Sequence, residues 1–268
     1  SNLGKVYWLK VYLIPLAGRN SRGRPMVNLL PLEAGERVTS ILPVEEYAEG
    51  HYIFMATANG TVKKTPLTDF ARRRSVGLRA LHLDDDDVLV GTAITQGDCD
   101  VMLFSSEGKA VRFKETDVRS MGRTARGIRG IRLGEGYNMI SLIIPQPDGM
   151  VLSVSENGYG KRTQIEGFPT KGRGGKGLIA MSTSDRNGKM VGAVQVFDGD
   201  ELMLISNQGT LVRTRSDEVS ILGRNTQGVR VIRTKDGESL VGVQRIDEPD
   251  ADLILENSED EIEDGAAD

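Results

Sequence analysis

An internal repeat of about 50 residues limits the possible folds of this chain more than any other feature. Each copy has an apolar run, a polar turn that ends in glycine, and a second run rich in β-branched and basic residues. The four clearest copies are YIFMATANGTVKKT (52–65), VMLFSSEGKAVRF (101–113), VLSVSENGYGKRT (151–163) and LMLISNQGTLVRT (202–214). Their turn glycines are Gly60, Gly108, Gly158 and Gly209, at spacings of 48, 50 and 51 residues, and a fifth copy begins at Gly4 without its first run. The pattern predicts a chain of equivalent units.

Each copy is typical of a β-hairpin, because two short apolar runs flank a turn that ends in glycine. The Asn59-Gly60 and Asn157-Gly158 pairs predict type I′ turns, in which both central residues take a positive φ.

A second glycine follows each turn glycine after 17 to 19 residues and closes a basic loop. The five loops are GRNSRG (18–23), RRRSVG (72–77), GRTARG (122–127), GRGGKG (172–177) and GRNTQG (223–228), each with an arginine four residues before its last glycine. We call these segments the glycine-basic loops. The apolar run that follows each of them indicates another strand.

Four short strands in each unit of about 50 residues are typical of a propeller blade. Helical periodicity is absent beyond single turns such as TPLTDF (65–70), so we expect less than about a fifth of the chain in helix. Kelch and WD40 blades have similar periods, but their sequence signatures are missing, and Trp8 is the single tryptophan. We predict an all-β disc of about five units, the first of them incomplete.

Composition excludes several kinds of chemistry. One cysteine, Cys99, excludes an internal disulfide and is typical of a cytosolic protein, and His51 and His82 leave little for histidine-based catalysis. No apolar run reaches the ~18 residues of a membrane span. The chain begins without methionine, and we expect it to be a fragment of a longer protein.

Charge is distributed unevenly. The last 22 residues, 247–268, carry eleven acids and no Lys or Arg, whereas residues 1–246 carry 34 basic and 27 acidic side chains, about +7. We expect a basic domain over 1–246 that binds a polyanion, and a mobile acidic tail that competes for the same cations. The alternative is a tail that only improves solubility. Its one apolar cluster, 253–255, is the segment that we would expect to dock on a blade edge.

Basic side chains recur at fixed positions in the repeat. Four residues after the turn glycine come Lys64, Arg112, Arg162 and Arg213, with Lys63 and Lys161 preceding two of them. The glycine-basic loops add a second row of cations: Arg19, Arg22, Arg72, Arg73, Arg74, Arg123, Arg126, Lys171, Arg173, Lys176 and Arg224. A ring of blades would carry these rows around its rim, where they could track the phosphates of duplex DNA without reading bases. In the alternative, these cations cap carbonyls or pair with the recurring acids Asp69, Asp117, Glu166 and Asp217.

Other motifs are weak. Gly172, Gly174 and Gly177 match G-x-G-x-x-G, but no helix is expected after them, so nucleotide binding is not predicted. The acidic run 84–87 is interpreted as a solvated turn rather than a cation site. We predict no catalytic residue, no metal site and no cofactor in this chain.

The sequence resembles the C-terminal domain of the A protein of bacterial DNA gyrase. The resemblance covers nearly all of 1–246 and runs through RGRPMVNLLPLE (22–33), FMATANGTVKKTPLTDF (54–70), VMLFSSEGKAVRFKETDVRSMG (101–122), GIRGIRLGEG (127–136), NGYGKRT (157–163) and GRNTQGVRVIRT (223–234). The equivalent protein of topoisomerase IV shares the fold but matches these stretches less well.

The resemblance implies a β-pinwheel, a propeller-like disc whose blades exchange strands. It implies that double-stranded DNA wraps around the basic rim and that the whole enzyme, an A2B2 assembly with the gyrase B protein, introduces negative supercoils with ATP in the bacterial cytoplasm. Cleavage, ATP and Mg²⁺ belong to other parts of that enzyme. Rival interpretations are a propeller that binds an acidic protein and a scaffold whose cations are paired internally.

The family's signature is a seven-residue box, Q-[RK]-R-G-G-[RK]-G, in a first repeat that this chain lacks. The most similar segment is a degenerate copy: Lys171, Gly172, Arg173, Gly174, Gly175, Lys176 and Gly177. We therefore expect this chain to bind DNA but to wrap it poorly.

Overall fold

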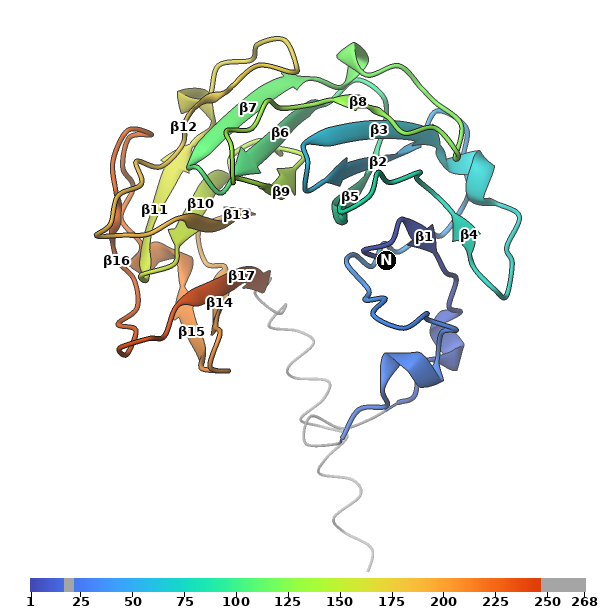
Figure 1. Ribbon diagram of the computed structural model, residues 1–268, viewed down its shortest axis with the longest axis horizontal. Helices are drawn as coiled ribbons and strands as arrows, with labels where there is room; N and C mark the ends of the chain where they lie inside the picture. Colours follow the sequence, from blue (N-terminus) through green and yellow to red (C-terminus); the bar gives the residue numbers. More distant parts are fainter. Residues whose placement is uncertain (17–21, 247–268) are drawn as a thin grey trace, which may run out of the picture.

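The blades of the computed structural model follow one another along an arc, in the order of the sequence (Figure 1). The structure describes residues 1–16 and 22–246. Within these ranges the only helical segments are six 3-10 turns: η1 (Val11–Leu13), η2 (Met26–Asn28), η3 (Leu67–Phe70), η4 (Glu115–Asp117), η5 (Ile165–Gly167) and η6 (Ser216–Glu218). The all-β prediction is confirmed, including the single turn expected within 65–70.

Three blades have four antiparallel strands each. The first is built from β5 (Leu89–Thr95), β2 (Tyr52–Thr57), β3 (Thr61–Pro66) and β8 (Ile128–Arg129), in that order. The second has β9 (Met139–Ile143), β6 (Asp100–Ser105), β7 (Lys109–Lys114) and β12 (Leu178–Ile179). The third has β13 (Met190–Val196), β10 (Met150–Ser155), β11 (Tyr159–Gln164) and β16 (Val229–Arg230).

Two smaller sheets stand at the ends of the series. The incomplete first unit contributes β1 (Lys5–Val6), which pairs with β4 (Leu78–Arg79) of the next repeat. The last blade has three strands, β17 (Leu240–Ile246), β14 (Glu201–Ser206) and β15 (Leu211–Arg215).

The short outer strand of each complete blade comes from the following repeat. In the first blade, Val62 of β3 pairs with Ile128 of β8, which lies one repeat further along the chain. The same exchange joins β7 to β12 and β11 to β16. The donated strands lie on the convex side of the arc, and β5, β9, β13 and β17 lie on its concave side (Figure 1). The expected strand exchange between neighbouring blades is therefore present.

The hairpin turns differ from the prediction. Gly60 and Gly158 have φ of +79° and +78°, but Asn59 and Asn157 are not among the residues with positive φ. The amide of Gly60 donates to Thr57 O at 2.9 Å, so that Ala58 and Asn59 are the central residues of the turn. The type I′ prediction is wrong, because glycine follows the two central residues of the turn instead of being one of them.

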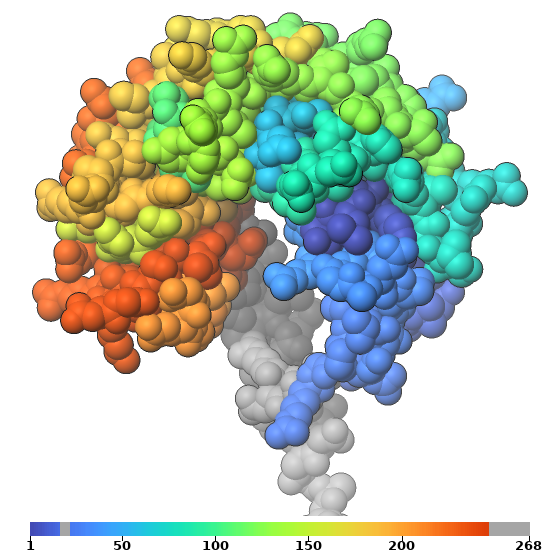
Figure 2. Space-filling view, in the orientation of Figure 1, coloured from blue at the N-terminus to red at the C-terminus, as the bar shows by residue number. Residues whose placement is uncertain are grey.

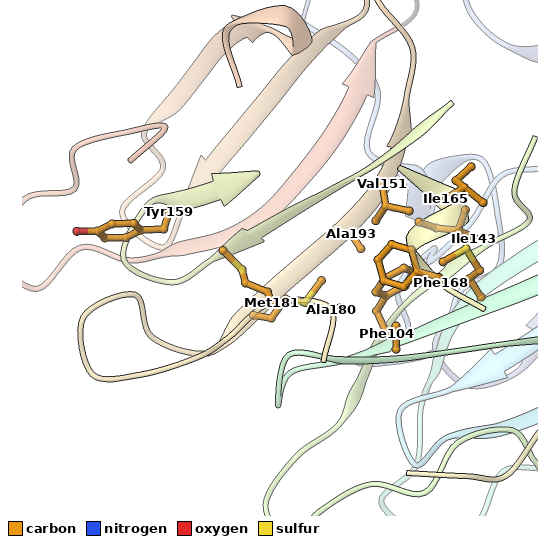
Figure 3. Packing of buried hydrophobic residues seen from close by; sticks show 12 residues of the cluster. Phe104, Ile143, Val151, Tyr159, Ile165, Phe168, Ala180, Met181 and Ala193 are labelled. Atoms are coloured by element: carbon orange, nitrogen blue, oxygen red, sulfur yellow. The ribbon is translucent and has the colours of Figure 1, made fainter. Parts of the chain in front are cut away.

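The core is formed between blades as well as within them. Phe104 on β6 packs edge-on against Phe168, which follows η5 in the next repeat, with ring centroids 6.0 Å apart. Val151 on β10 and Ile143 on β9 lie beside this pair (Figure 3). Neighbouring blades are in continuous contact in the space-filling view (Figure 2). The central hairpin strands of the complete blades are therefore covered on both faces.

Candidate nucleic-acid interface

The loops 172–177 and 223–228 are each joined by a backbone hydrogen bond to the segment that follows the preceding glycine-basic loop. The amide of Arg132 donates to Gly175 O at 2.8 Å, and the amide of Ser182 donates to Thr226 O at 3.0 Å. Because each loop leads into a donated outer strand, the loops follow the convex side of the arc (Figure 1).

Most of the predicted loop cations are exposed. Arg73 lies over the ring of Tyr47, with the guanidinium carbon 5.9 Å from the centroid. Arg126 pairs with Asp84 at 2.8 Å but keeps two thirds of its side chain exposed. The other exposed cations are Arg22, Arg72, Arg74, Lys171, Arg173 and Lys176. Arg123 and Arg224 are half-buried, and Arg19 lies outside the described residues.

Two loop arginines also connect neighbouring repeats. Arg173 donates through Nε to Asp117 O at 2.9 Å and through Nη1 to Arg129 O at 3.0 Å. Arg224 donates through Nη1 to Ile179 O at 2.8 Å. A guanidinium has five N–H donors, so these bonds orient the charged group and leave further donors for a phosphate.

The two lysines at the third position after the turn glycine are internal. Lys63 on β3 and Lys161 on β11 have no exposed surface. Lys63 Nζ donates to Ala80 O at 2.7 Å and also to Arg123 O, and Lys161 Nζ donates to Gly223 O at 2.7 Å and also to Arg224 O. We remove both lysines from the set of candidate DNA contacts, because a fully buried ammonium cannot reach a phosphate.

Burial lowers the pKa of both ammonium groups to about 8. For Lys63, Asp69 opposes this shift and Arg123 adds to it, and for Lys161 the charge of Arg224 adds to it.

The cations at the fourth position are also held inside the ring in the complete blades. Lys64 lies 3.5 Å from the buried carboxylate of Glu115. Arg162 donates to Val219 O and to Asp198, both at 2.8 Å. The side chains of Lys64 and Arg162 are each about 7% exposed, and we remove them from the candidate contacts as well.

Arg112 has the same kind of environment in the second blade. It pairs with Asp100 at 2.6 Å and donates to Ile165 O and Phe168 O of the next repeat, both at 3.1 Å. Arg213 differs, because its side chain is 56% exposed and pairs with Glu201. For the fourth-position cations, the sequence left open whether they contact phosphate or pair inside the protein. In the complete blades they pair inside the protein.

The acids that pair with this row were not those suggested by the repeat. Among the four suggested acids, the structure pairs Asp217 with Arg215, at 3.1 Å. Asp117 instead contributes its backbone oxygen to Arg173. In the acidic run 84–87, the carboxylate of Asp87 accepts from the amides of Asn59 and Val88, as in an ordinary turn.

One set of exposed cations was missed. Arg79, Arg129 and Arg230 are the second residues of the donated strands β4, β8 and β16, and all three are exposed. Each follows a loop glycine by two residues, and this fixed offset was the signal that could have revealed them. Arg230 also donates to Tyr159 Oη at 3.0 Å, and this bond, with a second from Arg186, lowers the pKa of the phenol.

The described residues contain no cluster of three or more His, Cys, Asp or Glu side chains that could hold a metal ion. No helix in the same part of the chain is long and apolar enough to cross a membrane. The thiol of Cys99 donates to Glu115, and burial together with this carboxylate raises its pKa to about 12, so it is a poor nucleophile.

Strand-exchanging blades with a row of exposed cations along their outer loops define a β-propeller of the pinwheel type. The family model described as "DNA gyrase C-terminal domain, beta-propeller" matches residues 1–45, 51–96, 100–146, 149–196 and 200–247. The chain belongs to the DNA gyrase C-terminal domain family.

Curated relatives are named as the A subunits of bacterial DNA gyrases. The protein of Salmonella typhimurium is 55% identical over 268 residues, which are all of this chain and 30% of the relative. The protein of Escherichia coli K12 is 58% identical over 249 residues, 93% of this chain and 28% of the relative. The chain therefore spans less than a third of the length of these relatives.

Solved structures agree with this assignment. The structure of a DNA gyrase A C-terminal domain aligns with a TM-score of 0.78 at 28% identity, covering 91% of this chain and 80% of that one. The C-terminal domain of DNA topoisomerase IV aligns with a TM-score of 0.84 at 23% identity, covering 92% and 77%, and this likeness shows the fold alone. The topoisomerase IV alternative is not favoured, because the curated relatives are gyrase A subunits.

Proposed function

We propose that this chain is the DNA-binding and DNA-wrapping part of a gyrase A subunit. The observation that carries the proposal is the row of exposed cations in adjacent loops: Arg72, Arg73, Arg74, Arg126, Lys171, Arg173 and Lys176. Cations in a continuous row suit the regular phosphate spacing of a duplex, and they give affinity without sequence preference.

In the whole enzyme, the chain would hold and bend a duplex while other parts do the chemistry. We propose an A2B2 assembly with the gyrase B protein in the bacterial cytoplasm, associated with the nucleoid. There, ATP-dependent strand passage would convert the wrapped duplex into negative supercoils. ATP and Mg²⁺ would act in other domains, and this chain itself would need no cofactor.

The test is a duplex-binding titration against salt. Simultaneous charge reversal at Arg73, Arg123 and Arg173 should weaken binding to all duplexes about equally. It should also make the slope of log K against log[salt] less steep, by roughly 0.9 for each phosphate that is no longer neutralised. The matched control reverses three cations outside the loops, Lys10, Arg37 and Lys189. Equal losses in both triple variants, or a loss confined to one DNA sequence, would contradict the proposed interface.

We also propose that wrapping by this chain is weak, because KGRGGKG (171–177) is a degenerate box. A nicking-closing assay should show little change in linking number when the chain is added to circular DNA. A large change would mean that the loops of this chain are sufficient for wrapping.

The acidic segment 247–268 lies outside the described residues, and its competition with DNA stays a prediction. Deleting it changes the net charge from −4 to about +7. The deletion should raise DNA affinity, most clearly at low salt, where screening is weak. Equal affinities at low salt would refute the competition.

A further inference from the structure

The third position after the turn glycine differs between blades, and the loop that packs on it differs as well. The position is held by Lys63 in β3, Val111 in β7 and Lys161 in β11. The loops of the following repeats that face these residues are 122–127, 172–177 and 223–228. We call the contacts of Lys63 and Lys161 with their loops the lysine interfaces, and the contact of Val111 with its loop the valine interface. The two kinds can be compared within one chain.

The first anchor of each loop is the same in all three interfaces. The fourth-position residue accepts a backbone bond from the residue before the loop: Lys64 O from Met121 N at 2.8 Å, Arg112 O from Lys171 N at 2.7 Å, and Arg162 O from Leu222 N at 2.8 Å.

The final glycines of the three loops also meet equivalent carbonyls. A Cβ placed on Gly127, Gly177 or Gly228 would lie 2.6 Å from the carbonyl oxygen of Val62, Ala110 or Gly160. The two ends of the three loops are therefore held in the same way. A different backbone conformation in the middle of one loop must have another cause.

The peptide after the loop arginine has opposite orientations in the two kinds of interface. In the lysine interfaces, the carbonyls of Arg123 and Arg224 accept from the buried ammonium groups of Lys63 and Lys161 and so point inward. The trans peptide is planar, with its C=O and N–H on opposite sides. The amides of Thr124 and Asn225 therefore point outward, toward solvent.

In the valine interface, the inward direction is taken by an amide. Gly174 N donates to Gly130 O at 2.6 Å, so the carbonyl of Arg173 faces outward. Gly174 has φ of +77°, whereas Thr124 and Asn225 at the same loop position do not have a positive φ. Glycine adopts this conformation without the steric cost that a side chain would add. The short Val111 leaves a cavity of about 210 Å³ against this loop, lined in part by Arg112, Gly172 and Gly175.

We propose that Lys63 and Lys161 are positioning residues that turn the following loop's carbonyls inward and its amides outward, toward phosphate. An outward N–H attracts a phosphate and an outward C=O repels it. The loops 122–127 and 223–228 would bind DNA through backbone amides as well as side chains, whereas 172–177 would depend on its cationic side chains. This inference rests on the proposed DNA-binding function of the loops.

The first test uses the unmodified chain without DNA. Amide hydrogen exchange, corrected for intrinsic rates, should be at least about tenfold slower at Gly174 than at Thr124 and Asn225, because only the first amide is hydrogen-bonded inside the ring. Comparable protection at the three amides would overturn the proposed orientations. The result does not depend on DNA binding, so this failure is distinct from failure of the proposed function, in which the unmodified chain would bind no duplex.

The second test removes each ammonium. Lys63→Met should change exchange within 122–127 and leave 223–228 unchanged, and Lys161→Met should do the reverse. An equal change in all blades would indicate global destabilisation and overturn the positioning role. The charge-matched control is Lys114→Met, because that side chain is 56% exposed and pairs with Asp100.

Duplex affinity distinguishes positioning from simple loss of charge. Each buried-lysine variant should bind a duplex about three- to tenfold more weakly than the Lys114→Met control, because hydrogen bonds from the amides disappear together with the charge. Affinities of the buried-lysine variants equal to that of the Lys114→Met control would overturn the positioning role.

Discussion

The third four-stranded blade and the last blade have similar hairpin sequences but different surroundings. In the third blade, β11 is buried along most of its length and pairs with β16 of the following repeat. In the last blade, β15 alternates between exposed and half-buried residues, and no described strand pairs with its outer edge. Both hairpins form with equivalent registers. The hairpin is therefore a local property of the sequence, whereas burial of its second strand depends on the next repeat.

Glycine substitutions should give the largest contrast between the two blades. Gly158 and Gly209 have φ of +78° and +81°, but a Cβ on Gly158 would lie 2.3 Å from Ile232 O, whereas nothing lies within 4 Å at Gly209. Gly158→Ala should lower the free energy of unfolding by about 3 kcal/mol or more, because backbone strain and a clash add. Gly209→Ala should cost about 1 kcal/mol, from strain alone. Urea denaturation measures both values, and equal losses would contradict the assignment of Gly158 to a blade interface.

Removing the fourth-position arginine should give the next largest contrast. Arg162 donates to carbonyls of the next repeat and to Asp198 in the connection between β13 and β14, whereas Arg213 pairs with Glu201 on its own hairpin. Arg162→Met should cost about 3 kcal/mol, because buried acceptors lose their donor. Arg213→Met should cost less than about 1 kcal/mol, as expected for an exposed ion pair. Comparable costs in urea denaturation would show that the following repeat does not stabilise the row of cations.

Stability should also depend on pH through the blades that contain a buried lysine. Burial holds the pKa of Lys63 and Lys161 at about 8 in the folded chain, below the ~10.4 of an exposed lysine. The unfolded chain then binds more protons between pH 8 and 10, so the free energy of unfolding should rise with pH in this window. The rise should be absent from the Lys63→Met/Lys161→Met variant. The last blade has Val212 at this position, and Val212→Met should leave the rise intact.

The sequence predicted the repeats, the succession of four strands along each unit and the exposure of most loop cations. It did so because the turn glycines and loop glycines recur once in every unit, both where the unit's own turn needs a positive φ and where the backbone meets a neighbouring repeat. The burial of Lys63 and Arg162 was not predicted. Alternation along a strand places one face toward solvent only when one side of the sheet is open, and both faces of these hairpins are covered by neighbouring blades. A repeat comparison also aligns equivalent residues and so could not identify partners such as Glu115, which pairs with Lys64 of the preceding repeat.

The outer edge of the hairpin should give the smallest effect. Val62 and Leu211 both follow the turn glycine by two residues, but Val62 is fully buried and pairs with β8, whereas Leu211 is 57% exposed. Val62→Thr should lower the free energy of unfolding by about 2 kcal/mol, because a hydroxyl is buried beside the donated strand. Leu211→Thr should change it by less than about 0.5 kcal/mol, as expected for a surface site. A loss of about 2 kcal/mol at Leu211 as well would mean that the edge of β15 is covered in solution. The contrast between a complete blade and the last blade would then no longer hold.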